Sequence, residues 1–165
     1  MKAKFRRSLF LVVWAFLAGP VFAQSLPFKA LLNTTYEKDF PLVYPEQKEL
    51  LREAVILDTR EQEEFSVSHL ESARWVGYET FSMESVSDIP KDETIVVYCS
   101  IGGRSQEIGK KLRAAGFRDV YNLYGGIFHW VNEDNPVFID SLQTERIHTY
   151  NKMWGMWLKK GEKVY

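Results

Sequence analysis

The stretch "ETIVVYCSIGGRSQEIGKKLRAAG", from Glu93 to Gly116, joins an apolar run, a glycine-containing turn and an amphipathic segment. The run that ends at Tyr98 is rich in β-branched residues without polar alternation, which predicts a strand buried on both faces. Apolar residues at helical spacing follow the two glycines, and Gly116 marks the expected helix end. A strand, a short loop and a helix in this order are typical of a parallel α/β sheet.

The same alternation extends on both sides of this stretch. Helical patterns lie between short apolar runs, so we expect an α/β fold with three layers: a central, mostly parallel sheet flanked by helices. The buried run before Cys99 predicts the central strand. The segment after Pro136 is expected to form a loop and then a helix that packs on the domain through Trp154 and Trp157, with a partner-binding tail as the alternative. The predicted strands cover residues 54–58, 73–78, 93–99 and 117–126.

Composition describes a globular chain. Hydrophobic residues make up 45% of the 165 residues and charged residues 26%, which suits one domain with short extensions. The net charge of −1 gives no sign of a nucleic-acid partner.

The first 23 residues have the layout of a secretory signal peptide. Four basic residues precede an apolar run from Leu9 to Ala18, and Val21 and Ala23 suit a cleavage site after Ala23. An uncleaved membrane anchor is the alternative, but the apolar run is short for a membrane span of about 20 residues, so we expect cleavage. Cleavage would leave 17 basic and 22 acidic residues, a net charge of −5, on a periplasmic or secreted protein without stable membrane anchoring.

Cys99 is the only cysteine, so this sequence forms no internal disulfide. A buried inert thiol is one interpretation. The residues that follow favour a reactive one, because Gly102 and Gly103 allow the loop to curl so that its N–H groups point inward. The start of the next helix and the forked guanidinium of Arg104 add positive potential, which favours thiolate over thiol. Ser105 is expected to cap or steady that helix.

Three blocks of sequence closely resemble a single-domain rhodanese. They are "LDTREQEEFSVSHLESAR", "IVVYCSIGGRS" and "GFRDVYNLYGGIFHW", in the family's order and spacing. The tail "IHTYNKMWGMWLKKGEKVY" resembles an extension found in some exported bacterial members. The resemblance implies a sheet of about five strands. It divides the chain into a signal peptide (1–23), an N-terminal extension (24–50), a rhodanese-like domain (51–135) and a C-terminal extension (136–165).

The resemblance also implies an activity, that of a sulfurtransferase of the thiosulfate sulfurtransferase type without a cofactor. Cys99 would be the nucleophile that takes sulfane sulfur from a small donor anion such as thiosulfate and passes it, as a persulfide, to a thiol or cyanide. The loop amides would hold the anionic sulfur, and Arg104 would orient the donor. The expected substrate-binding residues are Ser100, Ile101, Gly102, Gly103, Arg104 and Ser105.

Other matched residues are expected to have supporting roles. Asp58 and Arg60 fall on the family's D-x-R pattern and are expected to support the loop or to pair with charges such as Glu64. His69 follows the first helix of the domain and is expected to pack there. The remaining histidines have no metal-ligand spacing with Cys99, so no metal site is expected.

Two other function classes stay open at this point. Phosphatases and arsenate reductases with a related loop have one more residue between cysteine and arginine, and the C-x4-R spacing here favours sulfur. Rhodanese-like binding modules are the second class, but they usually lack the cysteine, and the presence of Cys99 with Arg104 disfavours that role. A redox sensor or a persulfide carrier without turnover would use the same Cys99, and the sequence does not separate these roles from an enzyme's.

Overall fold

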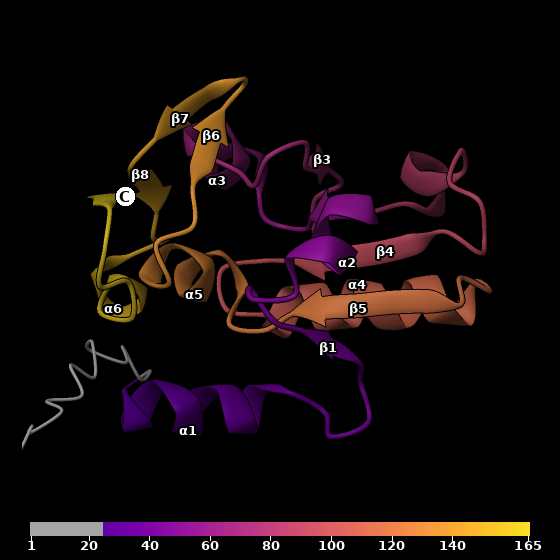
Figure 1. The fold of residues 1–165 in the computed structure, drawn as a ribbon, viewed down its shortest axis with the longest axis horizontal. Helices are drawn as coiled ribbons and strands as arrows, with labels where there is room; N and C mark the ends of the chain where they lie inside the picture. Colours follow the sequence, from indigo (N-terminus) through magenta and orange to yellow (C-terminus); the bar gives the residue numbers. More distant parts are fainter. Residues whose placement is uncertain (1–24) are drawn as a thin grey trace, which may run out of the picture.

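A sheet of five parallel strands forms the centre of the computed structural model, which describes residues 25–165 (Figure 1). Strand β4 lies in the middle of the sheet, so both predictions, a parallel sheet and a central strand before Cys99, are confirmed. The signal peptide expected at residues 1–23 lies outside the described residues. The sheet order is β1 (Leu42–Val43), β5 (Asp119–Leu123), β4 (Thr94–Tyr98), β2 (Val55–Asp58) and β3 (Arg74–Trp75).

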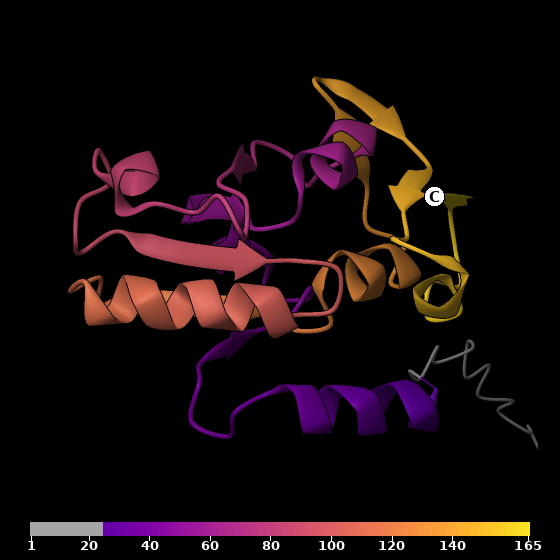
Figure 2. The ribbon, with the colours of Figure 1, turned by 180° about the vertical axis from the view of Figure 1, so that it is seen from behind.

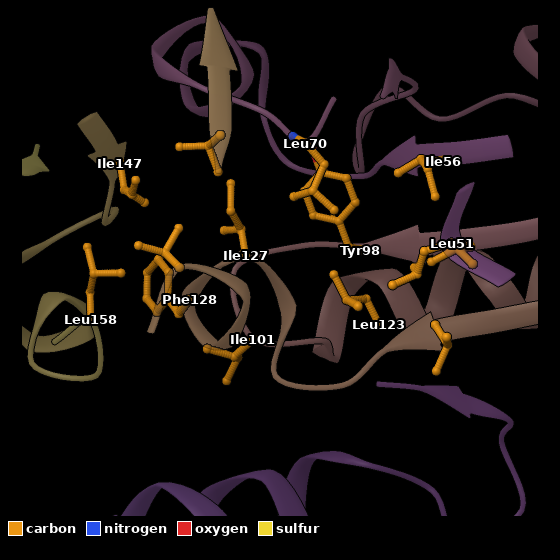
Figure 3. Close-up of a cluster of buried hydrophobic side chains, with 14 of the residues drawn as sticks. Leu51, Ile56, Leu70, Tyr98, Ile101, Leu123, Ile127, Phe128, Ile147 and Leu158 are labelled. Carbon is orange, nitrogen blue, oxygen red and sulfur yellow. The ribbon is translucent and has the colours of Figure 1, made fainter. Parts of the chain in front are cut away.

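Helices cover both faces of this sheet. Successive side chains of a strand point to opposite faces, and Ile95 and Val97 of β4 join the apolar cluster that includes α4 and η1. Val96 and Tyr98 join the cluster on the other face, with α1, α2 and α5 (Figure 3). The helices of this part are α1 (Leu26–Thr35), α2 (Lys48–Glu53), α3 (Gln62–Val67), the 3-10 helix η1 (Met83–Val86), α4 (Gly103–Ala114) and α5 (Gly126–Asn132).

The C-terminal segment differs from the expected loop and helix. It forms two pairs of short strands and one helix of four residues, because its apolar residues are spaced to reach the domain in separate places. Ile147 and Leu158 are fully buried beside Phe128 of α5 (Figure 3). The elements are the antiparallel pair β6 (Val137–Ile139) and β7 (Leu142–Thr144), the parallel pair β8 (Arg146–His148) and β9 (Glu162–Val164), and α6 (Lys152–Gly155).

The segment before the domain is also part of the fold. Phe28 and Leu32 of α1 are buried in the main apolar cluster, and β1 forms one edge of the sheet. The ring of Phe28 stacks on Trp157 with 5.5 Å between centroids, which joins the two ends of the described chain. In both views α1 and α6 extend past the carboxyl end of β4 (Figure 2). None of the helices within residues 25–165 is long and apolar enough to cross a membrane.

Candidate active site

Cys99 follows the last residue of the central strand, as the sequence predicts. Its side chain is buried, and the Gly102 N–H donates a hydrogen bond to its Sγ over 3.1 Å. Gly102 has a φ of 108°, in the region that favours glycine, so the loop can turn this N–H back toward the sulfur. Helix α4 begins at the next residue, and the first N–H groups of a helix have no partner inside it. The thiol therefore lies against the Gly102 N–H, next to the start of α4.

The start of α5 holds the other side of the Cys99 loop. The Ile127 N–H donates to the Cys99 carbonyl over 2.9 Å, and the Phe128 N–H donates to the Ser100 carbonyl over 3.1 Å. A Cβ at Gly126 would overlap the Cys99 carbonyl oxygen, so only glycine lets the two segments approach this closely. The glycines in "YGGIFHW" therefore serve this approach as well as a tight turn.

Tyr36 joins the Cys99 loop to the turn before α5. Its hydroxyl donates to the Ile101 carbonyl over 2.6 Å and accepts from the Gly125 N–H over 2.7 Å. Burial raises the pKa of Tyr36 well above its ordinary value, so the hydroxyl keeps its proton and donates. A Cβ at Gly102 would overlap the Tyr36 ring. A residue from the expected N-terminal extension thus fixes the loop.

Ser105 has a different position from the one expected. Its hydroxyl donates to Oδ1 of Asn122 over 2.7 Å, inside the fold, and it does not cap α4. Asn122 lies on β5 and donates through Nδ2 to the Gly102 carbonyl over 2.8 Å. The Ser105 side chain therefore supports the loop through Asn122.

Arg104 lies beside the cavity but is held by a carboxylate. Its Nη1 and Nη2 are 2.6 and 2.8 Å from the two carboxylate oxygens of Glu64, and Nη2 also lies 3.1 Å from the Ser100 hydroxyl. Burial by itself would lower the pKa of Arg104, but the hydrogen bonds and charge of Glu64 raise it above its ordinary value. The guanidinium stays charged, and much of that charge is offset by Glu64.

Asp58 and Arg60 form a buried ion pair with each other. Nη2 of Arg60 lies 2.6 Å from Oδ2 of Asp58, and both side chains are fully buried. The same nitrogen donates to the Ser68 carbonyl over 2.6 Å, and the guanidinium lies over the ring of Tyr98. These contacts connect the end of β2 with the residue before Cys99, which is a supporting position.

His69 lies outside the cavity. Its ring stacks on Phe65 with 4.3 Å between centroids, and its Nδ1 is 2.9 Å from the Leu70 carbonyl. Its backbone pairs with Phe138. This is the packing position that the sequence suggests.

A cavity of about 570 Å³ opens at Cys99. Its wall includes most of the expected loop residues, together with residues from four other parts of the chain. From the loop come Cys99, Ser100, Ile101, Gly103 and Arg104, and from elsewhere Thr35, Glu61, Tyr78, Glu79, Tyr150 and Trp154.

The family is shown by a match over more than half of the chain. The family model described as "Rhodanese-like domain" matches residues 44–133. The chain belongs to the rhodanese-like family. The rhodanese-like domain therefore contains the Cys99 loop, Glu64 and the ion pair of Asp58, whereas Tyr36, Tyr150 and Trp154 lie outside the matched residues.

Curated relatives are similar over the same part. The chain is 32% identical over 94 residues to the thiosulfate sulfurtransferase GlpE of Pseudomonas fluorescens, covering 56% of this chain and 85% of that one. It is 33% identical over 86 residues to the probable adenylyltransferase/sulfurtransferase MoeZ of Mycobacterium tuberculosis, covering 52% of this chain. The chain spans only 22% of the length of that relative.

Solved structures show the same fold. A rhodanese-like domain from Anabaena has a TM-score of 0.54 at 26% identity, covering 61% of this chain and 82% of that one. A rhodanese-related protein from Thermoplasma volcanium has a TM-score of 0.56 at 22% identity, covering 61% of this chain and all of that one. The α/β fold with a parallel sheet flanked by helices is therefore rhodanese-like.

Proposed function

We propose that the chain is a sulfurtransferase in which Cys99 carries sulfane sulfur as a persulfide. The observation that carries this proposal is the hydrogen bond from the Gly102 N–H to Cys99 Sγ. Cys99 lines the cavity and lies between the end of β4 and the start of α4. Backbone donors in that place stabilise a negative sulfur, both as the attacking thiolate and as the outer sulfur of a persulfide. The similarity to a thiosulfate sulfurtransferase supports the same chemistry.

The cycle has two displacement steps. In the first, the Cys99 thiolate attacks the outer sulfur of a donor such as thiosulfate, the donor's S–S bond breaks, and sulfite leaves with the electron pair. In the second, an acceptor thiolate or cyanide attacks the outer sulfur of the persulfide, and Cys99 leaves as a thiolate. No external oxidant or reductant is needed, because each step forms one bond to sulfur and breaks another.

Arg104 contributes to the reaction by holding a fixed guanidinium beside Cys99. Since Glu64 binds both of its terminal nitrogens, Arg104 presents only part of its charge to a donor anion. Its hydrogen bond to the Ser100 hydroxyl fixes the residue after the nucleophile. We propose that Arg104 orients the donor from this clamped position and does not move freely in the cavity.

Mass spectrometry of the intact protein tests the proposal. After incubation with thiosulfate and removal of excess reagent, Cys99 should carry one additional sulfur atom, and the Cys99→Ser variant should carry none. A thiol or cyanide should then remove the sulfur, and repeated cycles should release sulfite. A Cys99→Ser variant that still transfers sulfur would overturn the proposal, and sulfur uptake without repeated cycles would indicate a carrier.

A further inference from the structure

The cavity at Cys99 is much larger than a small sulfur donor needs. Its volume of about 570 Å³ corresponds to roughly twenty water molecules at about 30 Å³ each. Cavities of about 300–1,000 Å³ are the usual size of sites for organic ligands. A second substrate with an organic body therefore has room above the thiol.

Aromatic side chains form much of the apolar wall. Tyr78 comes from the rhodanese-like domain, and Tyr150 and Trp154 come from the C-terminal segment beyond the matched residues. The faces of such rings attract cations as well as apolar groups. The C-terminal segment therefore adds surface to the site that the domain alone does not supply.

Local contacts hold these two aromatic residues in place. The Asn151 side chain accepts a hydrogen bond from the Trp154 N–H over 3.0 Å at the start of α6. The Thr149 N–H donates to the Val164 carbonyl over 2.8 Å. Tyr150 has a φ of 64°, which a residue with a side chain adopts only when its surroundings impose it. These contacts fix the backbone that carries the two rings, and the Tyr150 side chain itself is largely exposed.

The charges around the cavity favour a cation. Glu61 and Glu79 line the wall, and the only cationic side chain among the lining residues, Arg104, is paired with Glu64 and also lies 3.9 Å from Glu61, so one positive charge faces three carboxylates. Burial and then the charge of Glu79 raise the pKa of Glu61 above its ordinary value, against the opposing effect of Arg104. Two carboxylates and three aromatic rings favour an ammonium group over an anion of the same size.

We propose that this cavity selects an acceptor thiol with a positively charged amine close to an apolar or aliphatic body. The inference rests on the proposed sulfur transfer and adds its acceptor class. The acceptor's amine lies between Glu61 and Glu79, facing the aromatic wall, while its thiolate attacks the outer sulfur of the Cys99 persulfide. One S–S bond forms, one breaks, and Cys99 is left as a thiolate beside the product persulfide.

The experiment measures discharge of the loaded protein by thiols of similar size and different charge. Full-length protein is loaded with thiosulfate, freed of excess reagent and mixed with 2-aminoethanethiol, 2-mercaptoethanol or 3-mercaptopropanoate. Loss of the added sulfur is followed by mass spectrometry. The ratio of the cationic to the neutral rate is compared between wild type and variants, so that the intrinsic reactivity of each thiol cancels.

Three variants change the wall without removing the nucleophile. Glu61→Gln and Glu79→Gln should each lower this ratio about two- to fivefold, and Trp154→Leu should lower it by a similar factor of about two to five. Both carboxylate variants should accelerate loading by thiosulfate, because a dianion then meets less negative charge. The control is Glu53→Gln, an exposed carboxylate just before β2 at the opposite end of the sheet, which should change neither rate.

The outcomes separate the two proposals. If the protein takes up sulfur and discharges it but all variants keep the wild-type ratio, the acceptor proposal is wrong and the sulfurtransferase proposal stands. If wild type takes up no sulfur, the proposed function is wrong, and the acceptor proposal is overturned with it. The neutral thiol serves as an internal standard for any variant that folds poorly.

Discussion

Glu64 binds Arg104 through both carboxylate oxygens, with N–O distances of 2.6 and 2.8 Å. This pair links α3 to the first turn of α4, next to the nucleophile. Glu64 is almost fully buried and also accepts a hydrogen bond from the Ser100 hydroxyl over 2.9 Å. The carboxylate therefore controls two residues of the Cys99 loop at once, which makes it a positioning residue for the site.

Replacing Glu64 should lower stability in a manner that depends on pH. Burial alone would raise the pKa of Glu64, but hydrogen bonds and charge from Arg104 lower it below the ordinary value. The unfolded chain then binds the proton first, so this contribution is complete above about pH 4.3 and is lost as pH falls through the folded pKa. Glu64→Gln should cost about 1.5–3 kcal/mol near neutral pH, because it removes charged hydrogen bonds.

Urea denaturation at several pH values measures this effect. Wild type should lose more unfolding free energy than Glu64→Gln as the pH is lowered below about 4.3. Glu63→Gln, an exposed neighbour on α3, is the matched control and should follow wild type. Parallel pH curves for wild type and Glu64→Gln would contradict the prediction.

Arg104→Lys tests the planar geometry of the guanidinium. Lysine keeps the charge but cannot bind both oxygens of Glu64 and the Ser100 hydroxyl at once. Turnover of thiosulfate should fall about tenfold to a hundredfold if one charged hydrogen bond of about 1.5–3 kcal/mol is lost in the transition state. Steady-state kinetics measure this, with circular dichroism as the test of folding. Arg118→Lys, on the surface, should keep wild-type kinetics, and unchanged kinetics in Arg104→Lys would remove the guanidinium from the reaction.

Local sequence patterns predicted the elements that carry the nucleophile. The β-branched run before Cys99 favours a strand, the glycines after it permit a tight loop, and the apolar spacing that follows favours a helix, so these three elements could be predicted without tertiary contacts. The partners of the loop could not. Tyr36 bonds to a carbonyl 65 residues away, and nothing in its neighbours indicates that contact. Trp154 packs on the domain as the sequence predicts, but its place in the wall of the Cys99 cavity depends on how β8 and α6 fold back.

Tyr36→Phe should loosen the Cys99 loop. The substitution removes one hydroxyl and leaves the Ile101 carbonyl and the Gly125 N–H without their partner, at about 1–3 kcal/mol for each buried group. The unfolding free energy should fall by at least one such amount, and the Gly125 amide should exchange with solvent faster. Denaturation and hydrogen exchange measure the two effects. Tyr44→Phe, on an exposed ring, is the control, and equal losses in both variants would count against the bridging role.

Gly102→Ala tests whether the loop needs glycine for its conformation, for space, or for both. A side chain at the φ of 108° costs about 1–2 kcal/mol, and the added Cβ would also overlap the Tyr36 ring. Gly116 provides the matched control, because its φ is 93° and nothing lies within 4 Å of an added Cβ. Gly116→Ala should therefore lose only the conformational part.

We expect Gly102→Ala to lose clearly more unfolding free energy than Gly116→Ala, and to take up less sulfur from thiosulfate. The reason for the second effect is that the Gly102 N–H, the donor to Cys99 Sγ, must move when the loop makes room for the methyl group. Combining Gly102→Ala with Tyr36→Ala should remove the overlap but keep the backbone cost. The double variant should therefore lose less unfolding free energy than the sum of the losses in the single variants Gly102→Ala and Tyr36→Ala. Denaturation of wild type, the three single variants and the double variant, with mass spectrometry of Cys99, measures this. Equal stability and equal sulfur uptake in the two glycine variants would show that the Tyr36 contact imposes nothing on the loop.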